Sequence, residues 1–317
     1  MQPLRSLAAA AALLALTLPA AADYPEREIT LIVPFGAGGS TDIVGRIAAQ
    51  ALSERLGVPV VVDNRGGAGG TVGTQYAAQA QPDGYTLTVA TTSTHVIGPL
   101  TNPTVPYDPL TAFDLIGMIA ETPYVLVTNP DLGAATVAEL VEQAHSAPGE
   151  MNYGSAGQGS ASHLAGLMFL AATGTEMEHV PYGSGAAAAT ATMGNEVQLS
   201  FVPVPTIQAQ VAAGSLDALG VGTAARSLQL PEVPTLQEAG VDGYRSSLWL
   251  GLAAPAGTPD AILAELNDAL ADALADAAVR EQLTQNGADP SPLDAAAFRE
   301  LIETEMTVYG AIVAAMN

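Results

Sequence analysis

Three loops that combine glycine with hydroxyl side chains have the composition of a binding site for a small anion. They are residues 36–41, 154–160 and 183–185, and each joins a predicted strand to a predicted helix. The first turn of a helix offers free backbone N–H groups and a partial positive charge, so it binds anions without a cationic side chain. Glycine allows close approach to the backbone, and Ser and Thr add donors. One such loop is usually an ordinary helix cap, but three at strand ends favour a site.

Few residues that could carry catalytic chemistry are present. All nine residues counted as Lys or Arg are arginines, and the chain has no cysteine. Walker A loops and Schiff-base enzymes need lysine, whereas thiol catalysis and thiolate metal sites need cysteine. The Gly-x-Ser-x-Gly elbow of α/β hydrolases does not occur in the sequence. The Gly-x-Gly-x-x-Ala matches at 183–188 and 220–225 lack the downstream acid of a dinucleotide site.

The four histidines show no spacing typical of a metal site, so we expect neither a metal ion nor a cofactor. They are His95, His145, His163 and His179. His163 lies one turn into a predicted helix, three residues after Ser160, and either faces the ligand or fills a structural role. Two roles stay open, with equal support, for Trp249, the only tryptophan: a core residue or a wall of the binding cleft.

The charge balance argues against nucleic acid and anionic membrane surfaces as partners. The chain has 317 residues, with 32 Asp and Glu against 9 basic residues and a formal net charge of −23. Nucleic acids and anionic lipids both require a basic footprint on the protein. With 49% hydrophobic residues the chain can nevertheless bury a large core, and its length allows one large domain or two of medium size.

The first 22 residues have the pattern of a signal peptide. Arg5 precedes an apolar stretch at 7–18, and Ala20-x-Ala22 follows as a small-x-small cleavage signal. The stretch is shorter than the roughly 20 residues of a membrane-spanning helix, and the alternative is a buried N-terminal helix. We expect cleavage after Ala22 and export to the periplasm. The mature chain then carries 8 − 32 = −24 charges.

Apolar strands alternate with helical segments, which is the pattern of an α/β fold. Strands are predicted at 29–33, 58–63, 87–90, 124–127, 152–153, 179–181, 197–202, 216–221 and 247–254. Helices are predicted over 43–57, from Val137, Ser160 and Gly185, and over 260–285 and 292–316. Continuous apolar strands between helices favour a mostly parallel sheet covered on both faces.

The order of these elements predicts two lobes with a ligand cleft between them. After the signal peptide at 1–22, residues 23–121 together with 246–317 are expected to form lobe I, and residues 122–245 to form lobe II. Each lobe is expected to hold a mostly parallel sheet flanked by helices. A chain that builds one α/β lobe, crosses over, builds a second and returns leaves a cleft between the two.

A series of motifs along the mature chain resembles the Bug family of extracytoplasmic solute-binding proteins, the receptors of tripartite tricarboxylate transporters. The first motif is Ile32-Val33-Pro34-Phe35-x-x-Gly38-Gly39-x-x-Asp42. Others follow in family order at 62–70, 82–87, 107–109, 152–164, 179–182, 231–240 and 254–259. The resemblance therefore extends over nearly the whole mature chain.

The resemblance implies the two-lobed, periplasmic-binding-protein-like fold, which closes like a flytrap on a small ligand. The ligands of the family are small carboxylates, such as dicarboxylates, tricarboxylates, amino acids or aromatic acids. The partners that it implies are this ligand and the membrane permease subunits of a tripartite tricarboxylate transporter. We expect a monomer that is not an enzyme and that binds no nucleic acid.

Transferred position by position, the resemblance assigns ligand contacts to both lobes. Those of lobe I are Phe35, Gly36, Ala37, Gly38, Gly39, Ser40, Thr41 and Asp42, with Ser93 and Thr94 added after the third strand. Those of lobe II are Ser155, Gly157, Gly159, Ser160 and His163, with Tyr182, Gly183 and Ser184 at the far end of the cleft. Within this set, Asp42 is expected to order its loop and the helix start rather than to touch the anion.

Two departures from the family pattern leave the identity of the ligand open. Many relatives have a Lys after the Pro-Tyr motif, where Gly183 follows Tyr182 here. Many also have an acid after the Phe of a later strand, where Val202 follows Phe201. If that acid faces a ligand amine, its loss disfavours an amino acid as the ligand.

Two alternative functions stay open at the level of the sequence. The first is a receptor that signals on ligand binding rather than delivering the ligand. The second is a secreted hydrolase or lyase with Asp42 or His163 as its acid or base. Against this second alternative, the sequence shows no nucleophile elbow, no metal constellation and no nearby pair of acids.

Overall fold

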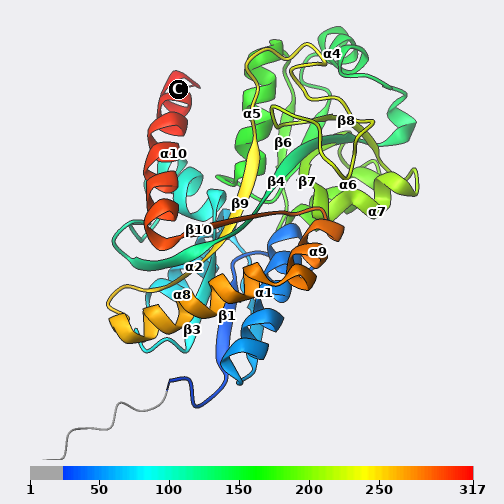
Figure 1. Ribbon diagram of the computed structural model, residues 1–317. Helices are drawn as coiled ribbons and strands as arrows, with labels where there is room; N and C mark the ends of the chain where they lie inside the picture. Colours follow the sequence, from blue (N-terminus) through cyan, green and yellow to red (C-terminus); the bar gives the residue numbers. More distant parts are fainter. Residues whose placement is uncertain (1–23, 317) are drawn as a thin grey trace, which may run out of the picture.

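The computed structural model describes residues 24–316, and the predicted signal peptide at 1–22 lies outside the described residues. The chain forms an α/β fold with two lobes, each built on its own part of a continuous, curled sheet (Figure 1). The two parts of this sheet are called sheet A and sheet B, and their strands are given below. The half of the molecule that carries sheet A is lobe I, and the half that carries sheet B is lobe II.

Sheet A forms the centre of lobe I. Its strands are β1 (Ile29–Val33), β2 (Val60–Asn64), β3 (Thr86–Thr91), β9 (Ser247–Pro255), the first part of β4 (Phe113–Thr128) and β10 (Asp289–Asp294). They lie in the order β2-β1-β3-β9-β4, with β10 beside β4. β1 is parallel to β2 and β3, whereas β9 is antiparallel to β3 and β4, and β10 is antiparallel to β4.

Sheet B forms the centre of lobe II. It combines the last part of β4 with β5 (Asn152–Ser155), β6 (Glu178–Pro181), β7 (Leu199–Pro203) and β8 (Asp217–Val221). β5 lies between β6 and β7 and is parallel to both, whereas β7 and β8 are antiparallel to β4.

Helices flank both sheets. Those that follow lobe I strands are α1 (Ser40–Leu56), α2 (Thr71–Ala78), α3 (Gly98–Thr101), α8 (Asp260–Ala275), α9 (Ala277–Gln285) and α10 (Ala295–Met316). Those that follow lobe II strands are α4 (Val137–Ser146), α5 (Ala161–Thr173), α6 (Gly185–Met193) and α7 (Val204–Ala212). Short helical turns cover η1 (Ala68–Gly70), η2 (Ser93–Ile97, a π-helix) and η3 (Pro130–Leu132). Over residues 24–316, none of these helices has the length and apolar character needed to cross a membrane.

β4 and the entry to β9 are the places where the chain passes between the lobes. β4 pairs with β9 between Phe113 and Pro123, and then with β7 between Tyr124 and Thr128. On the return path, the amide of Gly222 donates to Tyr124 O over 2.7 Å, and the amide of Ser246 donates to Gly222 O over 2.8 Å. Two adjacent backbone crossings of this kind are an arrangement that permits hinge closure.

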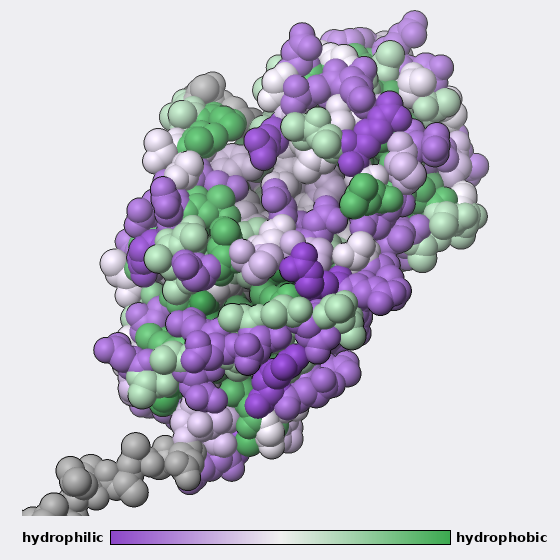
Figure 2. Space-filling view, in the orientation of Figure 1, coloured by the Kyte–Doolittle hydropathy of each residue, from purple (hydrophilic) through white to green (hydrophobic). Residues whose placement is uncertain are grey.

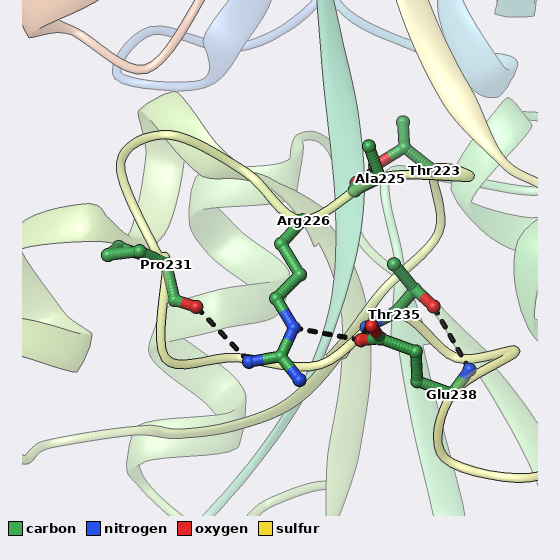
Figure 3. A network of polar contacts seen from close by, with 6 residues as sticks. All are labelled: Thr223, Ala225, Arg226, Pro231, Thr235 and Glu238. Atoms are coloured by element: carbon green, nitrogen blue, oxygen red, sulfur yellow. Dashed lines mark hydrogen bonds and ion pairs between the residues drawn. The ribbon is translucent and has the colours of Figure 1, made fainter.

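A polar network around Arg226 orders the long segment between β8 and β9 (Figure 3). Arg226 Nε donates to Glu238 Oε2 over 2.8 Å, and Arg226 Nη1 donates to Pro231 O over 3.3 Å. Glu238 Oε2 also accepts from the amide of Thr235, whose Oγ1 accepts in turn from the amide of Glu238. This reciprocal pattern is that of a capping box. It shapes the segment that leads back into the crossing to lobe I.

The predicted α/β class with two lobes agrees with the structure, but the sheets are mixed rather than mostly parallel. β9 returns from lobe II directly beside β4, without a crossover helix between them in the sheet, and it therefore runs antiparallel. The predicted strand at 124–127 is only the last part of β4.

Two predictions for the C-terminal region were wrong. The predicted helix at 260–285 is split into α8 and α9, because Asp276 has an extended backbone and its carboxylate accepts from the amide of Ala278. Residues 292–294, predicted as the start of a helix, belong to β10 instead. Its prolines are tolerated because β10 pairs with β4 alone, at the edge of the sheet.

Trp249 is a core residue of lobe I and is also among the residues that line a cavity between α10 and lobe II. It is 1% exposed and meets Phe298 edge-on, with ring centroids 5.0 Å apart. Its Nε1 donates to Glu305 Oε2 of α10 over 2.6 Å. Beside this pair lies a cavity of about 390 Å³, lined by residues of β4, β9, α5 and α10, and Figure 2 shows the surface hollowed between α10 and lobe II.

Replacing Glu305 with glutamine is expected to stabilise the protein above neutral pH. Burial raises the pKa of Glu305 to about 7, although the bond from Trp249 opposes the shift. Because the folded state holds the proton more tightly than the unfolded chain, stability falls as pH rises from about 4.5 to 7. Glu305→Gln keeps an acceptor for Trp249 without ionising. We expect a gain on the order of 2 kcal/mol at pH 8 and almost none at pH 4.

Urea unfolding at both pH values measures this effect. Glu303→Gln, an exposed substitution on the same helix, is the matched control and should leave the pH dependence unchanged. Equal stability of wild type and Glu305→Gln at pH 8 would contradict the expected cost of ionising Glu305.

Candidate functional site

The loop between β1 and α1 brings backbone amides to the interface of the lobes. β1 is an apolar strand inside sheet A, so its carboxyl end delivers residues 34–39 to the sheet edge that faces lobe II. Gly39 is the N-cap of α1 and supplies no capping side chain. The amide of Ser40, the first residue of α1, donates instead to Thr206 Oγ1 of α7 in lobe II over 3.0 Å. The first turn of α1 therefore depends on groups from outside its own helix.

Asp42 orders this loop from within α1. Its side chain is 6% exposed, and Oδ2 accepts from the amide of Gly38 over 2.9 Å. Oδ1 accepts from Asn64 Nδ2 and Arg46 Nη2, each over 2.9 Å. Burial raises the pKa of Asp42, but the hydrogen bonds from Arg46, Gly38 and Asn64 outweigh it and lower the pKa below its usual value. The carboxylate is thus fully engaged in positioning the loop.

The loop between β5 and α5 brings a second helix start to the same interface. Ser160 is the N-cap of α5, and its Oγ accepts from the amide of His163 over 3.2 Å. Ser162 Oγ lies 3.0 Å from Ser160 Oγ and accepts from the amide of Ala156 over 2.9 Å. The amide of Ala161, the first residue of α5, donates to Ser93 Oγ of lobe I over 2.9 Å.

A stack of two histidines supports the β5–α5 loop. The rings of His163 and His179 are stacked with centroids 4.0 Å apart. His163 Nδ1 accepts from the amide of Gly159 over 3.2 Å, and His179 Nε2 lies 2.6 Å from Ser155 Oγ. Burial, and then the charge of His179, lower the pKa of His163 to about 4, and burial also lowers the pKa of His179. Both rings are therefore neutral at pH 7. The ring of His163 positions the loop by accepting the hydrogen bond from the backbone amide of Gly159.

Acid is expected to destabilise the protein through His163. Its folded pKa of about 4 lies below the ordinary value of 6.5, so the unfolded chain binds the proton more tightly. The contribution of neutral His163 to the free energy of unfolding is complete above about pH 6.5 and is lost as pH falls towards 4. His163→Asn keeps an acceptor for Gly159 but does not titrate. We expect the variant to lose less stability than wild type between pH 7 and 4, by on the order of 2 kcal/mol.

Denaturant unfolding at several pH values tests this expectation. The measured quantity is the difference in free energy of unfolding between His163→Asn and the wild type, in which the contributions of the other titrating groups cancel. His145→Asn, on the exposed surface of α4, is the matched control and should follow the wild type. An unchanged slope for His163→Asn would show that His163 does not couple protonation to folding.

The loop at 183–185 and the glycine-rich loop at 66–70 complete the interface. Ser184 caps α6 by accepting from the amide of Ala187, and the preceding Gly183 O accepts from the amide of Gly36 over 3.3 Å. A Cβ on Gly69 would lie 2.5 Å from Gln158 O of lobe II. With φ at +65°, Gly69 has a conformation that other residues rarely adopt. The backbones of the two lobes are thus in direct contact.

A small cavity remains where these loops meet. Its volume is about 20 Å³, which is room for about one water molecule. It is lined by Phe35, Gly39, Ser40, Thr41, Ser93, Tyr124, Ala156, Ser162, Gly185, Pro203 and Leu248. Tyr124 is the only titratable residue of this lining, and burial raises its pKa. The lining consists of backbone amides, hydroxyls and apolar groups, and it provides no pair of acid and base.

The structure brings most of the predicted ligand-binding residues to this interface. Phe35, Gly39, Ser40, Thr41 and Ser93 line the cavity. Residues of the loops that meet across the lobes are Gly36, Ser155, Gly157, Gly159, Ser160, Gly183 and Ser184.

Other predicted residues lie apart from the cavity. Thr94 Oγ1 is turned into lobe I, where it bonds to Thr91 and His95. His163 lines a separate cavity of about 340 Å³ between α3, α5 and α10. Ala37 and Gly38 are exposed, and Asp42 and Tyr182 are absent from the lining.

Several lining and bridging residues escaped the sequence analysis. Thr206 and Pro203 come from the β7–α7 junction, and Tyr124 and Leu248 come from the crossing strands. Ser162 was recognisable only as a further hydroxyl two residues after Ser160. The glycines at 66–70 belong to the motif at 62–70, which by itself indicates no role in the site. No group of three or more His, Asp or Glu among the described residues could hold a metal ion.

Comparison with known proteins identifies the family of the chain. Residues 44–317 match the family model described as tripartite tricarboxylate transporter family receptor. The chain is 37% identical over 274 residues to the protein BugT of Bordetella pertussis, which covers 86% of this chain and 84% of BugT.

Two solved structures share the two-lobed fold. The periplasmic binding protein BugD is similar with a TM-score of 0.89 and 32% identity, over 92% of this chain and 98% of BugD. Rpa4515 of R. palustris, solved with adipate, is similar with a TM-score of 0.89 and 35% identity, over 93% of this chain and 98% of that chain. The resemblance seen in the sequence motifs is confirmed, and the chain belongs to the tripartite tricarboxylate transporter receptor family, to which the Bug solute-binding proteins belong.

Proposed function

We propose that this protein is a periplasmic receptor that captures a small organic carboxylate between its lobes and delivers it to the membrane permease subunits of a tripartite tricarboxylate transporter. In this proposal, residues 1–22 are the export signal, residues 23–121 with 246–317 form lobe I, and residues 122–245 form lobe II. The protein acts as a monomer and binds its ligand without transforming it.

The observation that carries the proposal is the convergence of three helix starts on one interface. The N-termini of α1, α5 and α6 meet there, and the amides of Ser40 and Ala161 already hold oxygen atoms from the opposite lobe. A carboxylate presents oxygen atoms of the same kind with a negative charge, which the partial positive charge of a helix start favours. The related structure of Rpa4515 with adipate supports a carboxylate as the ligand class.

Capture by hinge closure follows from contacts that only the closed form provides. A ligand that bridges α1 of lobe I and α5 of lobe II binds more tightly to the closed lobes than to either lobe alone. A ligand shifts a conformational equilibrium only by this difference in affinity. The acidic surface does not prevent binding, because the amides act within a few ångströms, whereas exposed charges are screened beyond about 10 Å at 0.1 M salt.

A thermal-shift screen of organic carboxylates tests the proposed function. The panel contains adipate, shorter and longer dicarboxylates, tricarboxylates, aromatic acids and amino acids, with the matching amides as uncharged controls. A ligand at 100 times its Kd stabilises the protein by about 2.7 kcal/mol, which is readily detected as a rise in Tm. We expect at least one carboxylate to raise Tm while its amide does not.

Two outcomes would contradict the proposal. Stabilisation by the amides as much as by the acids would exclude an anion site, and conversion of the bound carboxylate into a product would identify an enzyme. Recovery of the unchanged ligand in a 1:1 complex, detected by mass spectrometry, is the expected result.

A further inference from the structure

A second cavity lies beside the strands that carry the chain between the lobes, and we call it the hinge cavity. Its volume is about 390 Å³, which is in the range of pockets that hold small molecules. Its lining comes from β4, β9 and α10 of lobe I, from α5 of lobe II and from the segment that leads into β9 (Figure 1). None of these lining residues belongs to the cavity where the helix starts meet, so the two cavities are separate.

Three charged side chains line the hinge cavity without bonding to one another. They are Glu121 of β4, Arg245 of the segment before β9, and Glu305 of α10, and no N–O distance of 4.0 Å or less pairs them in the described part of the chain. Within residues 24–316, only Glu305 has a side-chain hydrogen bond, from Trp249 Nε1.

The three groups are nevertheless close enough to feel one another's charge. Burial raises the pKa of Glu305 to about 7 against the bond from Trp249, the charge of Glu121 raises this pKa further, and the charge of Arg245 lowers it. The hinge cavity thus presents one guanidinium and two carboxyl groups that are too far apart to bond directly.

The rest of the hinge cavity is largely apolar. Met118 of β4, Met168 of α5, and Leu301 and Ile312 of α10 contribute aliphatic or thioether side chains. Unbranched methionine side chains adapt to ligands of different shape. Charged groups beside an apolar lining favour a small ligand that has both a charged head and an apolar body.

We propose that the hinge cavity binds an amino acid with an apolar side chain, whose carboxylate pairs with Arg245 and whose ammonium group pairs with Glu121 and Glu305. An anion without an ammonium group would be repelled by the two carboxylates, and a cation without a carboxylate would leave the guanidinium unpaired. An amino acid satisfies both signs of charge, and its side chain lies against Met118 and Met168. This site is additional to the carboxylate site of the proposed function and does not depend on it.

Fluorescence titration at pH 8 tests the proposal directly, because Trp249 is the only tryptophan of the chain and lines the hinge cavity. At this pH Glu305 is mostly ionised. The probes are L-leucine, L-methionine and L-phenylalanine. Isocaproate is leucine without its ammonium group, and isoamylamine is leucine without its carboxylate. We expect saturable binding of at least one amino acid, with a Kd at least about tenfold higher for isocaproate and isoamylamine than for leucine, because each lacks one charge-assisted pair.

Two variants with matched controls locate the bound amino acid. Arg245→Met and Glu121→Gln should each raise its Kd at least about tenfold. Arg280→Met and Glu303→Gln change exposed residues outside the lining and should leave the Kd unchanged. Unchanged affinity in both Arg245→Met and Glu121→Gln would overturn the proposal, as would the absence of binding of all three amino acids. Isocaproate or isoamylamine binding as tightly as leucine would overturn the zwitterion and leave a simple anion or cation site.

Repeating the titrations in Gly39→Val separates the hinge cavity from the interface of the lobes. The substitution adds methyl groups in the gap between the starts of α1 and α6, far along the chain from the hinge cavity lining. We expect amino acid binding to persist in Gly39→Val. Binding that is lost in this variant but kept in Arg245→Met would place the amino acid between the helix starts and overturn the proposal. The proposed function is tested independently, by the thermal-shift screen of carboxylates.

Discussion

Replacing Gly39 with valine is expected to weaken carboxylate binding by at least about 100-fold without unfolding the protein. Gly39 has φ −80° and ψ 167°, an extended conformation that a β-branched residue adopts readily. A Cβ at this position would lie 3.8 Å from Gly36 O and 3.9 Å from the amides of Gly185 and Ala186. The γ-methyl groups of valine extend further into this gap, where the helix starts of α1 and α6 face each other. They would exclude the ligand from the amides of α1.

Gly39→Ala is the matched control, because contacts of 3.8 Å or more are ordinary for a Cβ. We expect its Kd to stay within about threefold of the wild type and its Tm to match that of Gly39→Val. Titration with the carboxylate found by the screen, together with thermal unfolding, gives both quantities. Wild-type affinity in Gly39→Val would place the anion away from the N-terminus of α1.

Replacing Asp42 with alanine is expected to destabilise the protein by about 3 kcal/mol. The substitution removes the acceptor of the Gly38 amide and of Asn64 Nδ2, and it leaves these groups without their partner. The loop that leads into α1 then loses its internal support, so ligand binding should weaken as well. Because the pKa of Asp42 is lowered in the folded state, the same support is lost in the wild type as pH falls through that pKa.

Arg46→Ala separates the ion pair from the loop anchor. The Arg46 side chain is 54% exposed, and its removal leaves the bonds from Gly38 and Asn64 in place. We therefore expect a loss of less than about 1 kcal/mol for this variant. Denaturant unfolding of both variants provides the comparison. Equal destabilisation by Asp42→Ala and Arg46→Ala would show that the ion pair, rather than the loop, carries the stabilisation.

Local periodicity was sufficient to predict the elements that lead into the site. The apolar run at 29–33 and the spacing of Val44, Ile47 and Leu52 specify a buried strand and a helix, and both appear as β1 and α1. β10 escaped prediction because Pro290 and Pro292 are unfavourable in a strand, and only pairing with β4 makes the segment extended. The antiparallel direction of β9 was equally hidden, because strand direction depends on the path of the chain through space.

The candidate site shows the same division between local and distant information. Helix starts rich in Gly and Ser were visible because capping depends on neighbours in sequence, as for Ser160 and Ser184. The different roles of the adjacent residues Ser93 and Thr94 were not visible. The π-helical turn directs the Ser93 hydroxyl to the amide of Ala161, which lies across the interface of the lobes. It directs the Thr94 hydroxyl to the ring of His95, which lies inside the core.

By itself, the sequence determined the α/β class, the family and the three loops of Gly and Ser that begin helices, because these depend on residue types at short spacing. Only the tertiary structure decided that the sheets are mixed, that glycines at 66–70 let the lobes touch, and that Thr206 and Ser93 reach the helix amides across the interface. Thr206 and Ser40 are 166 positions apart in the chain, and no local pattern encodes such a contact. The physical reason is that a hydrogen bond across an interface depends on how two lobes pack, which is set by the whole fold rather than by neighbouring residues.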